Sequence, residues 1–138
     1  MELRDQIESL YKEQEGLLHL LQRIERALEL ASKEDFSDYS RSISELHALE
    51  YRLADITEHC HAAGRIFEST CSHYLEKEEY TRIDSQHQEI IRAVTDFREE
   101  LKSVTAERTM AMIASGTGLV DGLRTHIAFE RGLFDRMA

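Results

Sequence analysis

His126 and Glu130 are two residues whose types and spacing could do chemistry together. Four positions apart, they lie on one face of an α-helix, one turn from each other, and can point at a common cation. Adding His87 from another segment gives two imidazoles and one carboxylate, a set that suits a facial non-haem iron site with open positions for water or a gas. His59 could supply a further nitrogen ligand or a hydrogen bond to one of the ligands.

The same residues also have a purely structural interpretation. A polar residue at an interior position of a helical bundle can fix register and pairing, with His87 hydrogen-bonded to Glu130 or to a backbone carbonyl. That interpretation is favoured for any one of them alone. Several such residues at matching depth favour a metal instead, because coordination satisfies groups that are costly to bury without partners. The predicted metal ligands are His59, His87, His126 and Glu130.

Apolar residues recur at helical spacing in four segments, which must position these side chains. The first segment runs over 3–31 and the second over 42–67, with turn-forming and capping residues between them. Ser42 and Glu45 have the spacing of a capping box, so we expect the second helix to begin at Ser42. Its predicted interior face consists of Leu46, Leu49, Leu53, Ile56, Cys60, Ala63 and Phe67.

The third and fourth segments carry most of the candidate ligands. A polar stretch over 69–81 is expected to precede the third helix, and the fourth helix is expected to begin within 105–109. The interior series of the fourth helix includes both His126 and Glu130. The interior series of the third helix is Ile83, His87, Ile90, Val94, Phe97, Leu101 and Val104.

Two glycines, Gly116 and Gly118, fall inside the fourth predicted helix. Each costs about 1 kcal/mol relative to alanine in a helix interior, so they weaken this helix or mark its true start. Short connections between four similar helices favour antiparallel neighbours with sites between facing helices. We therefore predict an all-α, up-down-up-down four-helix bundle that forms one domain over residues 1–138.

Composition narrows the classes of partner. The formal net charge of −10 argues against a nucleic-acid backbone or an anionic membrane, because neither supplies the counter-charge that such a chain needs. No apolar run approaches the roughly 20 residues that span a bilayer, and the charged N-terminal stretch lacks the apolar core of a signal peptide. We expect a cytoplasmic protein.

The remaining cysteines and histidines are expected to play no part in the site. Cys60 and Cys71 are eleven residues apart, so on one helix their Cα atoms are about 16 Å apart, too far for a disulfide. Cys60 is expected to be a small buried hydrophobe. The histidines predicted to lie on the surface are His19, His47, His61 and His73.

The two halves of the sequence look like two copies of one helical hairpin. A shift of 73 residues superposes the first predicted helix on the third and places Gln14 over His87. A shift of 67 superposes the second helix on the fourth, with His59 over His126 and Ala63 over Glu130. The polar residues therefore fall at duplicated positions, and the second half keeps the more complete set.

This pattern resembles the hemerythrin-like cation-binding family, through the motifs His87-Gln-Glu-Ile-Ile and His126-Ile-Ala-Phe-Glu130. The resemblance implies a duplicated four-helix bundle that holds a non-haem di-iron centre between histidines and carboxylates. Gln14 departs from the family pattern, with Glu15 as a candidate substitute ligand, and Ala63 replaces the first carboxylate. The resemblance thus implies one intact half-site, formed in the second half of the chain.

The leading functional hypothesis is a protein that binds non-haem iron, as one ion or two, or another divalent metal, and that senses or handles oxygen, nitric oxide or iron. Expected partners are the metal ion and a small gas ligand, with a second copy of the chain or a regulatory protein as further candidates. The alternative is a metal-free bundle acting as a regulatory or interaction module. An enzyme that uses the half-site for peroxide or oxygen chemistry is a third hypothesis, although nothing in the sequence argues for turnover.

Overall fold

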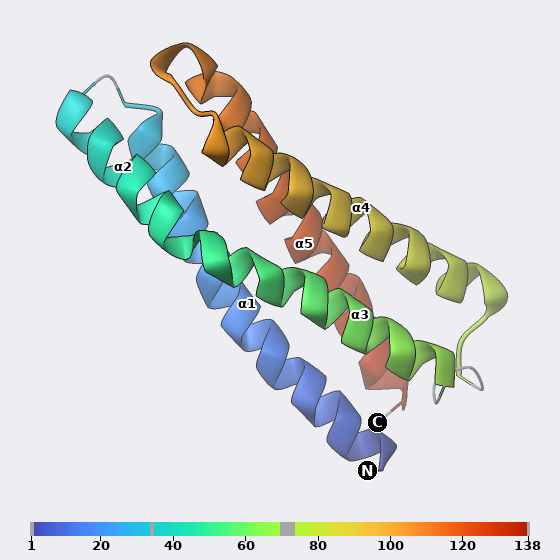
Figure 1. Ribbon diagram of the computed structural model, residues 1–138. Helices are drawn as coiled ribbons and strands as arrows, with labels where there is room; N and C mark the ends of the chain where they lie inside the picture. The colour runs from blue at the N-terminus through green and yellow to red at the C-terminus, as the bar shows by residue number, and fades with distance from the viewer. Residues whose placement is uncertain (1, 34, 70–73, 138) are drawn as a thin grey trace.

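The computed structural model describes residues 2–33, 35–69 and 74–137, and these residues form an all-α bundle of four helical arms without a strand. One arm consists of two helices joined by a single 3₁₀ turn, and Figure 1 shows it as a continuous path with a bend. A second 3₁₀ turn precedes the last helix. The elements are α1 (Leu3–Ala31), α2 (Phe36–Leu49), η1 (Glu50–Arg52), α3 (Leu53–Ser69), α4 (Lys77–Lys102), η2 (Ala106–Arg108) and α5 (Thr109–Met137).

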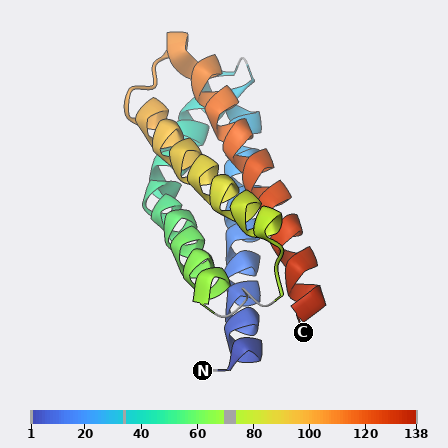
Figure 2. The ribbon, with the colours of Figure 1, turned by 90° about the vertical axis from the view of Figure 1, so that its right-hand side faces the viewer.

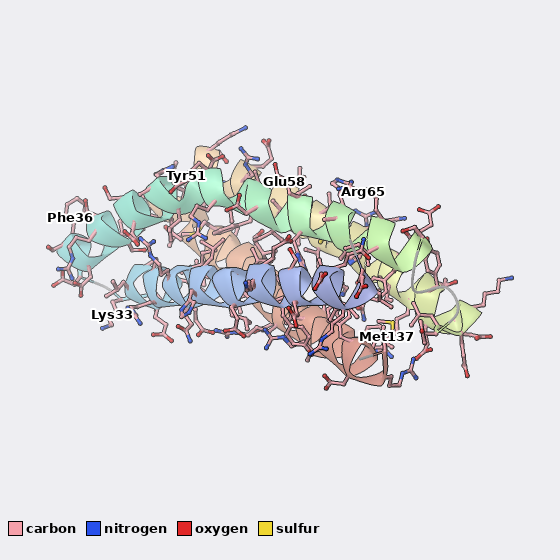
Figure 3. The ribbon with its side chains drawn as sticks, turned by 90° about the horizontal axis from the view of Figure 1, so that it is seen from below. Lys33, Phe36, Tyr51, Glu58, Arg65 and Met137 are labelled. Atoms are coloured by element: carbon pink, nitrogen blue, oxygen red, sulfur yellow. The ribbon has the colours of Figure 1, made fainter. Side chains whose placement is uncertain are left out.

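Each arm packs against two neighbours. Helix α1 lies between the α2–α3 arm and α5, and α4 lies between α3 and α5. The beginning of α1 and the end of α5 lie at one end of the bundle, whereas η2 and the beginning of α2 lie at the other (Figures 1 and 2). Figure 3 shows the same separation along the bundle, with Phe36 at one end and Met137 towards the other. This arrangement places the middle of all four arms side by side.

Helix α2 begins at Phe36, six residues before its predicted start at Ser42. Asp35 provides the N-cap, since its Oδ1 accepts a hydrogen bond of 3.1 Å from the backbone N–H of Asp38. Ser42 is fully buried inside α2, and its hydroxyl donates to the carbonyl of Ala27 on α1 at 2.5 Å. Glu45 accepts instead from an arginine of α1. The predicted capping box at Ser42 and Glu45 is therefore wrong.

Helix α4 also begins earlier than predicted, within the stretch taken as a polar connection. The side chain of Glu76 accepts from the backbone of Glu79, whose Oε1 in turn accepts from the backbone N–H of Glu76 at 3.0 Å. This reciprocal capping satisfies N–H groups of the first turn and places carboxylates at the positive end of the helix. Val104 lies beyond the end of α4. The predicted bounds of α1 and the predicted start of α5 are confirmed.

Helix α5 continues through both of its predicted weak points. A Cβ atom at Gly116 would lie 2.8 Å from the Cδ1 of Leu28 and 2.8 Å from the Cε1 of Phe97, so glycine lets α5 approach α1 and α4 closely. No such neighbour lies within 4 Å of a Cβ at Gly118. Gly116 is thus a packing residue, whereas Gly118 weakens α5 without such a contact.

The core is divided into two apolar clusters by a layer of buried polar side chains. The larger cluster fills one side and includes the predicted interior residues from Leu46 to Cys60. The smaller cluster consists of Ile7, Leu10, Ala63, Phe67, Ile83, Leu133 and Phe134. The polar layer consists of Gln14, His59, His87, His126 and Glu130.

Among the described helices, none is long and apolar enough to cross a membrane.

Candidate metal centre

Glu130 of α5 forms the middle of the polar layer, and its two carboxylate oxygens face different partners. Oε2 lies 3.2 Å from Nε2 of His87 and 3.2 Å from Nε2 of His126. Oε1 accepts a hydrogen bond of 3.0 Å from Nε2 of Gln14 and lies 3.4 Å from Nε2 of His59. The structure therefore brings all four predicted ligands together, with Gln14 as a fifth member, from α1, α3, α4 and α5.

His87, His126 and Glu130 form the tightest group. One ligand atom from each lies within 4.8 Å of the others, and the two imidazole rings meet edge to face with centroids 4.6 Å apart. Ligand atoms that lie about 2.1 Å from a metal, in octahedral or tetrahedral geometry, are separated by roughly 3.0 to 3.4 Å. The two nitrogen-to-oxygen distances of 3.2 Å fall inside that range. These residues could hold a divalent cation.

His126 carries a buried nitrogen that points to the same conclusion. Its Nδ1 lies 2.6 Å from Oε1 of Gln86, and because an amide oxygen only accepts, Nδ1 carries a hydrogen in either the neutral or the protonated ring. In the neutral ring Nε2 then presents a lone pair towards Oε2 of Glu130, and this nitrogen has no hydrogen-bond partner among the described residues. Two facing lone pairs require a cation between them, either a proton on the ring or a metal ion.

His59 lies on the other side of the carboxylate. Its Nδ1 is 2.8 Å from Oε1 of Glu13, a half-exposed carboxylate that only accepts, so Nδ1 carries a hydrogen. Burial lowers the pKa of His59, but the hydrogen bonds and negative charges of Glu130 and Glu13 outweigh burial and raise it overall. His59 therefore has the position of a hydrogen-bond partner of Glu130, the second of the two roles considered from the sequence.

Glu130 is held in its ionised form. Burial, the largest single effect, would raise the pKa of this carboxyl, yet the imidazoles of His126, His59 and His87 that face it hold it well below its usual range. A metal ligand of this type must be deprotonated. The interior of the bundle therefore presents a carboxylate anion at neutral pH.

Neither Glu15 nor Ala63, both in the first half of the chain, supplies a further carboxylate to the layer. Glu15 is exposed, and its Oε1 accepts a hydrogen bond of 2.7 Å from Arg131, so the expectation that Glu15 replaces a missing ligand is wrong. The physical reason is that Glu15 lies one residue beyond the interior stripe, where a cationic side chain of α5 meets it. Ala63 packs in the smaller apolar cluster.

Most remaining predictions for cysteines and histidines are confirmed. His19, His47 and His61 are exposed. Cys60 is buried, and burial followed by the charge of Glu130 raises the pKa of its thiol to about 12. It stays protonated at neutral pH, as expected of a small hydrophobe. Cys71 and His73 lie outside the described residues.

The apolar periodicity did not predict that Glu13 and Gln86 contact the polar layer, although the internal repeat relates these two residues. The shift of 73 residues that places Gln14 over His87 also places Glu13 over Gln86. Each holds Nδ1 of one histidine, at 2.8 Å for Glu13 and 2.6 Å for Gln86. Their side chains lie beside the interior stripe and reach in, so the overlay of the two halves was the signal that could have identified them.

Comparison with known proteins gives no relative from which a function could be transferred. No protein-family model matches the chain, and neither the curated proteins nor the solved structures gave a match. The functional argument therefore rests on the geometry of the polar layer itself.

Proposed function

We propose that this chain is a hemerythrin-like protein of up-down-up-down topology that binds one non-haem iron ion, or another divalent metal, through His87, His126 and Glu130. The observation that carries the proposal is the buried Nε2 of His126, which lacks a hydrogen-bond partner among the described residues and faces Oε2 of an ionised carboxylate. His87 presents a second Nε2 to the same oxygen at 3.2 Å.

The surrounding residues support the proposed site by fixing its ligands. Gln86 holds the ring of His126 so that Nε2 faces inwards, and Gln14 with His59 holds the other oxygen of Glu130. Outer hydrogen bonds of this kind orient metal ligands and raise their affinity. Bound iron with two nitrogen ligands and one oxygen ligand would offer open positions for a small gas. We propose a role in sensing or handling oxygen, nitric oxide or iron, without turnover.

Metal content of the purified protein tests the proposal. Protein prepared anaerobically without chelator should contain about one metal ion per chain, and an Fe²⁺ titration of the stripped protein should show one site. His87→Ala and His126→Ala should each weaken binding by more than the roughly 10- to 100-fold that loss of an outer hydrogen-bond partner costs. His61→Ala, which removes an exposed histidine of α3, should bind as the wild type does. Wild-type protein that takes up no metal would overturn the proposal.

One observation favours a second candidate, a metal-free regulatory or interaction module. Gln14 already donates to Glu130, and His59 faces the same oxygen, so the layer can serve to fix the register of the four arms. The two candidates differ in how the free energy of unfolding depends on metal concentration. A metal that binds only the folded chain stabilises it by about 2.7 kcal/mol at 100 times its Kd. A free energy of unfolding unchanged by Fe²⁺ would select the metal-free module.

A further inference from the structure

The polar layer consists of two related halves that share one carboxylate. In one half Gln86 holds His126, whose Nε2 faces Oε2 of Glu130, and in the other Glu13 holds His59, whose Nε2 faces Oε1. The shifts of 73 and 67 residues that relate the halves in the sequence thus also relate their hydrogen bonds. Glu130 has no second copy, but it presents one oxygen to each half.

Two of the differences between the halves lie at positions that are next to each other in space, and this holds in both halves. Gln14 stands where His87 stands in the other half, and Arg131 stands where the other half has Gly64. Nε of Arg131 donates to Oε1 of Gln14 at 2.9 Å. In the equivalent place, a Cβ at Gly64 would lie 3.6 Å from Nδ1 of His87. One half therefore has a glutamine held by an arginine, and the other has a histidine beside a glycine.

The arginine fixes which end of the glutamine amide enters the layer. A guanidinium always carries its charge and only donates, so the amide oxygen of Gln14 must face Arg131. The amide N–H groups are then directed to Oε1 of Glu130, at 3.0 Å. Glu15 accepts from a terminal nitrogen of Arg131 at 2.7 Å, and the guanidinium carbon lies 5.0 Å from the centroid of the Tyr11 ring. Arg131 is thus held from several sides.

A cation beside Oε1 would consequently meet an N–H donor where it needs a lone pair, with a fixed positive charge behind it. We propose that Arg131, acting through Gln14, takes the place of a second cation beside Glu130 and restricts the centre to one metal ion. Arg131 is a positioning residue in this account, and the inference rests on the proposed function. On this proposal, Gln14 and Arg131 are the reason that the centre binds a single metal ion.

The double variant Gln14→His with Arg131→Gly tests the inference. It recreates the His87 and Gly64 pair in the half of the polar layer that contains Gln14 and His59. Stripped wild-type protein is titrated with Co²⁺, and calorimetry and visible absorption monitor the binding. The wild type should bind one ion per chain. The double variant should bind two, with a second set of absorption bands that a merely structural change would not produce. Arg124→Gly is the matched control, since Arg124 also bridges α5 to α1, through Glu25 at 2.7 Å, but lies outside the layer. It should bind one ion.

Each result has a distinct meaning. Two ions in the wild type, or one ion of unchanged affinity in the double variant, would overturn the inference and leave the proposed function standing. No metal in the wild type or in the variants would overturn the proposed function and this inference with it. Should the added glycine prevent folding, Gln14→His with Arg131→Ala keeps a strong helix former in α5, and the same second ion is expected.

Discussion

The side chains of Gln86 and His126 are joined by a hydrogen bond of 2.6 Å between the amide oxygen and the ring Nδ1. This bond fixes which nitrogen of the ring carries hydrogen and which one faces Glu130. The neighbouring half repeats the device with Glu13 and His59 at 2.8 Å. The orientation of both histidines is therefore set by residues that lie beside the interior stripe.

Removing the Gln86 side chain should weaken metal binding without removing a ligand. In Gln86→Ala the ring of His126 loses the partner that orients it, and affinity for Fe²⁺ or Co²⁺ should fall by about 10- to 100-fold. Gln88→Ala is the control, because Gln88 is exposed and donates a hydrogen bond within α4, to Asp84 at 3.1 Å. Equal affinities for the two variants, measured by calorimetry, would contradict this role for Gln86.

Removing the central carboxylate should destabilise the metal-free protein strongly. Glu130→Ala leaves Gln14, His59 and His87 buried without the carboxylate that they share, a change that typically costs about 3 to 5 kcal/mol. Glu15→Ala breaks only an exposed ion pair and should cost about 0 to 1 kcal/mol. Urea unfolding with added chelator measures both. A small loss for Glu130→Ala would mean that the layer does not depend on this carboxylate.

The raised pKa of His59 gives a pH dependence with a definite sign. Its pKa in the folded chain lies above the ordinary value of 6.5, because Glu130 and Glu13 outweigh burial. The group therefore binds its proton more tightly in the folded state, and its contribution to stability is complete below pH 6.5 and lost as pH rises through the folded pKa. In chelator, the difference in unfolding free energy between the wild type and His59→Gln should narrow above pH 6.5.

The exposed neighbour provides the control for that titration. His61→Gln removes a histidine of the same helix from the surface, and its unfolding free energy should follow the wild type across the whole pH range. A difference between wild type and His59→Gln that widens with pH would contradict the assignment of Glu13 and Glu130 as partners of a protonated ring.

Two glycines of α5 should respond to alanine with opposite signs. Gly116→Ala forces a Cβ against Leu28 and Phe97 and should destabilise the protein, since overpacking of about 1 to 3 kcal/mol exceeds the gain in helix propensity. Gly118→Ala meets open space and should stabilise it by about 0.5 to 1 kcal/mol. Thermal unfolding of both variants measures the signs. A stabilising Gly116→Ala would show that α5 does not need this close approach.

The sequence predicts the helices well where apolar periodicity is dense, as in α1, and less well at helix starts. Ser42 continues the interior series of Leu46 and Leu49, but its hydroxyl resembles a cap, so the prediction placed the helix start there instead of at Asp35. A small polar residue inside a core and a capping residue look alike in one sequence. Only the packing against Ala27 separates them.

For the candidate site too, the sequence predicts part of the arrangement and the rest depends on packing. The interior stripe predicted His59, His87, His126 and Glu130 because periodicity reports the direction of a Cβ atom. It could not predict which carboxylate oxygen each histidine faces, because that depends on how the arms are rotated against one another. Long side chains that reach in from the edge of a helix, such as Arg131, leave no periodic signal.

An anomalous difference map from crystals of the metal-loaded protein tests the central claim most directly. The account predicts one peak per chain, about 2 Å from Nε2 of His87, Nε2 of His126 and Oε2 of Glu130. His126→Ala crystals treated in the same way should show no peak at this position. A peak elsewhere in the bundle, or no peak in the wild type, would contradict the account.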